Sequence, residues 1–122
     1  MFTANTMASV GEAIGMSLPG TAAIPAEDLK LRDAAVESGK QLNYLLKNNI
    51  KPSDIMTHNA FTNAITTVLA LGGSSNSVLH LLAIAHETGV ELSIDKFDQL
   101  SRSVPHLALS LIHISEPTRR YN

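Results

Sequence analysis

The sequence has no cysteine and no tryptophan, and aromatic residues fill only 4% of its 122 positions. Without thiolates the chain by itself cannot form a disulfide, bind zinc through sulfur or ligate an iron–sulfur cluster. It also lacks a long apolar run, because His80 interrupts the strongest stretch, residues 78–85. That stretch is far shorter than the roughly 20 residues that span a bilayer. We therefore expect no membrane association and no thiol chemistry from this chain.

An excess of either charge is also missing. Nine Lys and Arg residues stand against eleven Asp and Glu residues, which gives a formal net charge of -2. Nucleic-acid-binding domains usually carry a basic excess, so a nucleic acid is not an expected partner. The N-terminus lacks the basic-then-apolar layout of a signal peptide. A hydrophobic fraction of 44% with so little net charge is typical of one compact domain at most.

Helical spacing is the main pattern that the sequence does contain. Apolar residues recur at steps of three and four in five segments, and no segment shows the two-residue alternation of a strand. The fold class is therefore predicted to be mainly α, with about five helices over residues 3–15, 26–48, 57–71, 74–87 and 93–104.

Two of these helices carry further expectations. The helix over 26–48 has an apolar stripe of Leu31, Ala35, Leu42 and either Leu45 or Leu46. Gly39 inside it costs about 1 kcal/mol relative to alanine, which favours a close packing contact there. The helix over 74–87 is apolar nearly all round, as is typical of a helix buried within a larger body.

The five histidines do not form a recognisable metal pattern. A zinc-protease helix needs His-Glu-x-x-His. His86 and Glu87 begin that pattern, but Val90 stands where the second histidine is required. His80 and His86 are six residues apart and fall on different helix faces. No metal site is predicted, and the histidines are interpreted as core or solvated side chains.

Two polar segments are candidate binding sites. In the first, Gly72-Gly73 precede Ser74, Ser75 and Asn76 at the start of a helix, where free amides and hydroxyls can hold a carboxylate or phosphate. A serine-capped turn between two helices is the commoner alternative, and no lysine follows the glycines as in a phosphate loop. The second segment contains Thr3, Asn5 and Thr6, whose plainest interpretation is a helix N-cap.

The order of residues in three places resembles the dihydroxy-acid dehydratases. The three stretches are Met1-Phe2-Thr3-Ala4-Asn5-Thr6-Met7-Ala8-Ser9 with Glu12 to Gly20 following, Ile50-Lys51-Pro52-Ser53-Asp54-Ile55-Met56-Thr57, and Ala70-Leu71-Gly72-Gly73-Ser74-Ser75-Asn76-Ser77-Val78-Leu79-His80-Leu81. The resemblance runs from residue 1 to about 108. Ser75 departs from it, because the family usually has threonine there, but both residues carry a hydroxyl.

The resemblance implies a lyase of the hydro-lyase class. Such enzymes convert 2,3-dihydroxy acids into 2-keto acids for valine and isoleucine biosynthesis, in the cytoplasm. The resemblance implies an iron–sulfur cluster as Lewis acid, a magnesium ion held partly by a carbamylated lysine, and a serine base. It also implies homodimers of a two-domain chain, with an N-terminal α/β domain and a C-terminal β-barrel-like domain.

None of those catalytic or metal-binding residues maps onto this chain. In the family a cluster cysteine lies in a Cys-Gly-Gly directly before the methionine that matches Met1. The chain is thus expected to be an internal piece of the N-terminal domain, inactive and unable to bind either cofactor alone. Thr3, Asn5 and Thr6 are the candidate substrate-binding or supporting residues, followed by Ser74, Ser75 and Asn76.

Two alternatives stay open beside this interpretation. A sugar-acid or 6-phosphogluconate dehydratase of the same family is the nearer one, although Thr6 to Ser9 and Met16 to Gly20 resemble the branched-chain amino-acid member more closely. A non-catalytic helical interaction module is the alternative from another class. It would have to bury the apolar helix over 74–87 among only five helices.

The resemblance stops near Ala108. Residues 109–119, Leu-Ser-Leu-Ile-His-Ile-Ser-Glu-Pro-Thr-Arg, match one reading frame of a transposase-based sequencing adapter. Residues 109–122 are therefore predicted to be a non-native tail, and they are left out of functional arguments. The predicted domain organisation is residues 1–108 as dehydratase and residues 109–122 as tail.

Overall fold

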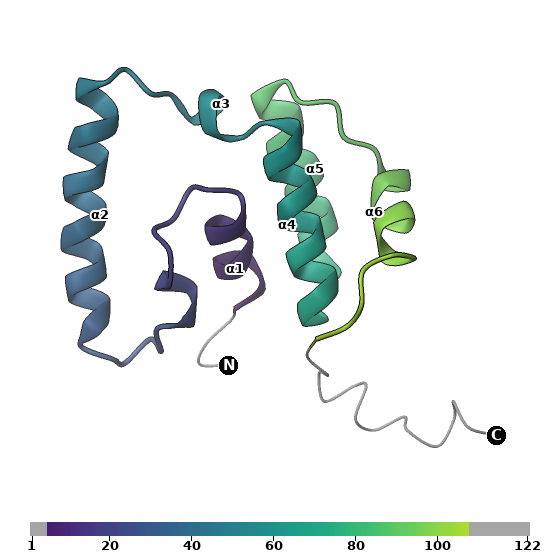
Figure 1. The fold of residues 1–122 in the computed structure, drawn as a ribbon, viewed down its shortest axis with the longest axis horizontal. Coiled ribbons are helices and arrows are strands. Elements are labelled where there is room, and N and C mark those ends of the chain that lie inside the picture. The colour runs from purple at the N-terminus through teal and green to yellow at the C-terminus, as the bar shows by residue number, and fades with distance from the viewer. Residues whose placement is uncertain (1–4, 108–122) are drawn as a thin grey trace.

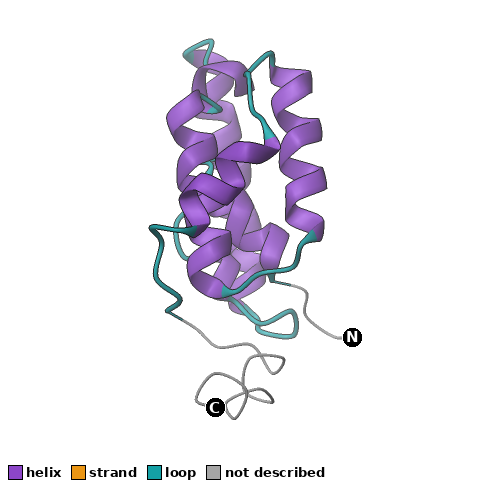
Figure 2. Cartoon of the chain, turned by 90° about the vertical axis from the view of Figure 1, so that its right-hand side faces the viewer, coloured by secondary structure: helices purple, strands orange, loops and turns teal. Residues whose placement is uncertain are grey.

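The computed structural model describes residues 5–107, and every regular element within that range is helical. This confirms the mainly α expectation, and Figure 2 shows only helices and loops over the described residues. The predicted tail and Thr3 lie outside them. The elements are α1 (Thr6–Ala13), the 3-10 turn η1 (Thr21–Ala23), α2 (Lys30–Lys47), α3 (Pro52–Ile55), α4 (His58–Leu71), α5 (Asn76–Thr88) and α6 (Ile94–Ser101).

Three helices, α1, α5 and α6, pack around α4 and form a four-helix bundle with it. Helix α4 contacts α1, α5 and α6, and α5 contacts α1 and α6 in turn. The core is apolar at helical spacing, as the sequence predicts. Its buried residues are Val10 and Ile14 from α1 and its C-cap, Phe61, Ala64, Ile65 and Val68 from α4, Leu81 and Ala85 from α5, and Phe97 from α6. Figure 1 shows this bundle with α2 standing at the opposite edge of the molecule.

Local chemistry explains where α4 begins and ends. The Thr57 hydroxyl accepts a hydrogen bond from the Ala60 amide at 3.3 Å, so Thr57 is the N-cap. At the other end Gly72 adopts a left-handed conformation, with φ of 62°. Both ends agree with the predicted range of residues 57–71.

Three helices begin later than predicted. Helix α1 begins at Thr6, with Asn5 as the residue before it. Helix α2 begins at Lys30 and not near Ala26. The Asp28 carboxylate accepts a hydrogen bond from the Lys30 amide at 2.9 Å, and this bond holds the residues before Lys30 in a turn. Helix α5 begins at Asn76 because hydrogen bonds of Ser74 hold the preceding residues in a turn. The later starts of α2 and α5 reflect side-chain-to-backbone bonds that periodicity does not report.

One helix was not predicted. Lys51 is extended before Pro52, with φ of -96° and ψ of 157°, because a residue that precedes proline avoids the helical region. Pro52 then opens the four-residue helix α3, where its missing N–H costs nothing. The Asp54 carboxylate accepts from the Lys51 amide at 2.8 Å and closes this short turn.

Helix α5 is buried on one face only, so the cover that so apolar a helix normally has in a larger body is incomplete within the described residues. Ser77, Leu81 and Ala85 are buried, whereas Leu79 is 69% exposed. The reason is that α1, α4 and α6 can cover a single side of α5. Its other apolar side faces outward in this part of the protein.

Helix α2 contributes no buried residue, although it is the longest helix of the described chain. The expected close contact at Gly39 is absent, because a Cβ built there meets nothing within 4 Å. Of the two alternatives for its stripe, Leu45 shares a groove with Leu31, Ala35 and Leu42, while Leu46 is 71% exposed. Among the described residues, none of the helices is long and apolar enough to cross a bilayer.

Candidate functional site

The two polar segments predicted from the sequence meet in space. The Ser74 amide donates a hydrogen bond to the Thr6 hydroxyl oxygen at 3.2 Å, across 68 positions of sequence. Between them is a cavity of about 280 Å³, which we call the polar pocket. Its walls come from the start of α1, the end of α4 and the turn before α5: Asn5, Thr6, Ser9, Val68, Leu71, Gly72, Gly73 and Ser74.

Gly73 allows this close approach. A Cβ at position 73 would lie 2.9 Å from Thr6 Cγ2 and 3.1 Å from Val68 Cγ1, both closer than ordinary carbon contacts. The Gly73 amide also donates to the Val68 carbonyl at 2.9 Å and closes the end of α4. The sequence predicted the turn from its two glycines, but it carried no signal that Gly73 is packed against Thr6.

The serine turn is largely satisfied by its own hydrogen bonds. The Ser74 hydroxyl accepts from the Asn76 amide at 3.3 Å, and the Ser77 hydroxyl donates to the Ser74 carbonyl at 2.7 Å. The Ser77 amide donates to that same carbonyl at 3.1 Å. Amides that were expected to be free for an anion are thus bonded within the chain, which favours the capped turn.

The candidate residues therefore separate into two groups. Asn5, Thr6 and Ser74 line the polar pocket, whereas Ser75 and Asn76 do not. Sequence reasoning missed Ser9, which lines the pocket one turn after Thr6, and Ser77, which is only 1% exposed. Its helical spacing from Leu81 and Ala85 was the available signal that Ser77 faces the core.

A second hollow lies between α1 and α2. We call it the α1–α2 groove; residues 12–21 form one wall, one face of α2 forms the other, and Ile55 lies at its edge. Its volume is about 750 Å³. This is the larger hollow, and it is mostly apolar.

Glu12 stabilises the wall of this groove that residues 12–21 form. Its carboxylate accepts hydrogen bonds from the Gly20 amide at 2.6 Å and from the Ala22 amide at 3.0 Å. These two bonds favour the ionised form, so they hold the pKa of Glu12 below its ordinary value of 4.5. Its partners are backbone amides eight and ten residues away, which no sequence pattern indicates. The role of Glu12 could therefore not be predicted from the sequence.

Within residues 5–107, no group of three or more His, Cys, Asp or Glu side chains comes together in a way that could hold a metal ion. Neither hollow offers a ligand set for magnesium, which prefers several oxygen donors at octahedral positions. The polar pocket contains hydroxyls and an amide but no carboxylate. Its chemistry is that of neutral hydrogen bonding.

Comparison with known proteins identifies the chain's relatives. Residues 1–111 match the family model "Dihydroxy-acid/6-phosphogluconate dehydratase N-terminal". Over 108 residues the chain is 57% identical to the dihydroxy-acid dehydratases of Mycobacterium ulcerans and Acidothermus cellulolyticus, and 52% identical to that of Saccharolobus islandicus. Each alignment covers 88% of this chain and 19% of the relative.

The chain thus spans about a fifth of the length of these curated relatives. The family model covers nearly the whole chain, including the polar pocket and both walls of the α1–α2 groove. The chain belongs to the dihydroxy-acid/6-phosphogluconate dehydratase family, of which it represents a piece of the N-terminal region.

Proposed function

We propose that this chain is part of a dehydratase that converts 2,3-dihydroxy-3-methyl acids into 2-keto acids in valine and isoleucine biosynthesis. The observation that carries the proposal is the 57% identity to proteins named dihydroxy-acid dehydratase, over 108 residues. Thr6 to Ser9 and Met16 to Gly20, the stretches that resemble the branched-chain amino-acid member, lie in α1 and in the groove wall.

The cofactors of such an enzyme have to be held by residues outside this chain. The sequence contains no cysteine for an iron–sulfur cluster, and its described residues bring no three metal-ligating side chains together. The cluster and Mg²⁺ would supply Lewis acidity toward the leaving hydroxyl in the complete enzyme. The isolated chain is accordingly expected to be inactive.

The contribution of this chain is then to shape and support the site. Asn5, Thr6 and Ser74 offer neutral hydrogen-bonding groups at the polar pocket, which suits the hydroxyls of a dihydroxy acid. Thr3 precedes them in the same segment, and Ser75 and Asn76 directly follow Ser74 in the sequence. We assign these six residues to substrate contact or to its support, in a cytoplasmic homodimeric enzyme.

A sugar-acid or 6-phosphogluconate dehydratase is the second candidate, because the matching family model names 6-phosphogluconate dehydratase beside dihydroxy-acid dehydratase. The two candidates differ in substrate and not in overall chemistry. No residue of the polar pocket is basic, so this pocket offers no pairing partner for a phosphate group. That feature disfavours 6-phosphogluconate and is compatible with either unphosphorylated substrate, the dihydroxy acid or a sugar acid.

The test is to recover the longer reading frame and to express the complete enzyme. We expect Cys-Gly-Gly directly before Met1, and formation of a 2-keto acid from dihydroxyisovalerate. Activity on aldonates but not on dihydroxyisovalerate would establish the second candidate instead. Dehydration by the isolated 122-residue chain would contradict the assignment of catalysis to residues outside it.

A further inference from the structure

The α1–α2 groove is an unfilled apolar surface on a helix that needs cover. Helix α2 has 18 residues and buries none of them. An isolated helix of this length is marginal in water, so helices in proteins depend on packing of their apolar face. The apolar face of α2 lines the groove with Leu31, Leu42 and Leu45. Leu42 is still 58% exposed there.

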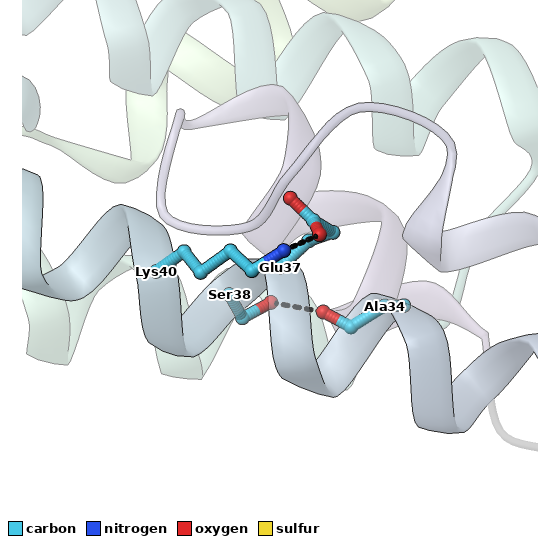
Figure 3. A network of polar contacts seen from close by, with 4 residues as sticks. All are labelled: Ala34, Glu37, Ser38 and Lys40. Atoms are coloured by element: carbon cyan, nitrogen blue, oxygen red, sulfur yellow. Dashed lines mark hydrogen bonds and ion pairs between the residues drawn. The ribbon is translucent and has the colours of Figure 1, made fainter.

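Three of the five polar side chains in the groove, Glu12, Thr21 and Ser38, are already hydrogen-bonded within the chain. The Ser38 hydroxyl donates to the Ala34 carbonyl at 2.8 Å, back along its own helix (Figure 3). The Glu12 carboxylate is held by the Gly20 and Ala22 amides. A small polar ligand would therefore find few free partners, whereas apolar side chains would fill the space well.

We propose that the α1–α2 groove is the docking site for an apolar segment of the same polypeptide, lying outside residues 1–122 in the longer dehydratase. The relatives supply the first reason. Because this chain matches only 19% of their length, about four fifths of such a polypeptide is available to reach the groove. A tethered segment also loses less translational and rotational entropy on docking than a separate partner does.

The shape of the groove supplies the second reason. A two-fold interface places the same patch of two copies face to face, and two concave patches cannot fill each other. A head-to-tail contact would instead build an open chain of copies unless its rotation closes. A segment of the same polypeptide fills the groove without either difficulty.

Charge defines the chemistry of the occupant. Glu12 is the one ionisable side chain among the described residues that line the groove, and no basic side chain there balances it. The occupant is therefore mainly apolar, with a lysine, arginine or N–H donor at the Glu12 end. An acidic residue at that end would be repelled by the carboxylate.

Residue-specific photocrosslinking in the complete, cofactor-loaded enzyme tests this proposal. Benzoylphenylalanine replaces Leu42 in the groove or, as the control, Val36 on α2 outside it. The two positions are matched, at 58% and 59% exposure in the described chain. We expect Leu42 to crosslink to an apolar peptide outside residues 1–122, with the mass of a single polypeptide, and we expect Val36 not to do so.

Three results would overturn the proposal. They are a product of twice the mass from Leu42, equal crosslinking from Leu42 and Val36, and a crosslinked peptide whose residues at the Glu12 end are acidic. A second pair of variants guards against disturbance by the bulky probe. We expect Leu42→Ser to lower the thermal unfolding midpoint of the complete enzyme and Val36→Ser to leave it unchanged; equal midpoints would count against docking.

The proposal rests on the chain being part of a longer dehydratase, but its readout is independent of substrate. If the enzyme fails to act on dihydroxyisovalerate and the Leu42 crosslink still forms within one polypeptide, the proposed substrate is wrong and the docking stands. If the enzyme is active and Leu42 behaves like Val36, the docking is wrong and the proposed function stands.

Discussion

The four-helix bundle and helix α2 are built from similar sequence patterns but differ in how far their apolar faces are buried. Helix α4 places Phe61, Ala64 and Ile65 at zero exposure, at the helical spacing that the sequence shows. Helix α2 has an equally regular stripe, yet all its residues remain at least partly exposed. An amphipathic pattern therefore establishes that a helix has a face to bury, but not that the partner lies within the same segment.

The same contrast holds for their glycines. Gly73 in the bundle is pressed against Thr6 and Val68, whereas Gly39 in α2 has open space around its missing side chain. One glycine is required by packing and the other only costs backbone entropy. Substitutions in the two regions should consequently change the unfolding free energy by different amounts. At the two glycines, the changes should have opposite signs.

The largest effect should come from the centre of the bundle. Phe61→Ala removes a fully buried ring from the contact between α4 and its neighbours, and we expect a loss of about 3–5 kcal/mol in unfolding free energy. Urea unfolding of the chain followed by circular dichroism measures it. Leu46→Ala on α2, where the side chain is 71% exposed, is the control and should change stability by less than about 0.5 kcal/mol. Equal losses would erase the distinction between the two regions.

The next effect concerns the contact between α1 and the serine turn. Gly73→Ala places a Cβ 2.9 Å from Thr6 Cγ2, and overpacking of this kind costs about 1–3 kcal/mol. Thr6→Ser removes that methyl group and keeps the hydroxyl that accepts from Ser74. We expect the double variant to recover part of the loss in urea unfolding, as a double-mutant cycle requires for residues in contact. Strict additivity would show that the two residues do not meet.

A smaller effect is expected at the wall of the α1–α2 groove. Glu12→Gln replaces a charged acceptor of two backbone bonds, and we expect a loss of about 1 kcal/mol near neutral pH, given its partial exposure. Because the folded pKa lies below 4.5, the carboxylate stabilises the fold above that pH and loses its effect as pH falls through the folded pKa.

The pH dependence of this variant provides its check. Thermal unfolding midpoints of wild type and Glu12→Gln should differ most above pH 4.5 and converge in more acidic solution. A difference that persists unchanged in acid would point to lost packing and not to the carboxylate.

The smallest effect should be a gain. Gly39→Ala places a methyl group in open space within α2 and lowers the entropy of the unfolded chain, so we expect about 0.5–1 kcal/mol of added stability. The helical signal in circular dichroism should rise together with the unfolding midpoint. A loss at Gly39 would show that α2 is packed more closely than its exposure indicates.

Much of the fold was predictable because core periodicity is a local property. The apolar spacing located all five longer helices, and Thr57 and Gly72 marked the ends of α4. The starts of α2 and α5 were misplaced because Asp28 and Ser74 bond to nearby backbone. Which face of α5 stays exposed was also not predictable, since it depends on which helices are present to cover it.

The site was predictable in its parts but not in its assembly. Both polar segments stood out in the sequence, yet their meeting depends on Gly73 and on the packing of α1 against α4. Glu12 was missed for a different reason. Its partners are backbone amides, which every residue except proline carries, so no side-chain pattern distinguishes them.

The hydrogen bond between Ser74 and Thr6 also bears on the order of events during folding. It joins residues 68 positions apart, and closing so long a loop costs chain entropy. Such a contact forms more readily once shorter-range contacts have stabilised part of the chain. The contacts within the α4–α5 hairpin need no such closure and can form first. We therefore expect the polar pocket to assemble after the α4–α5 hairpin.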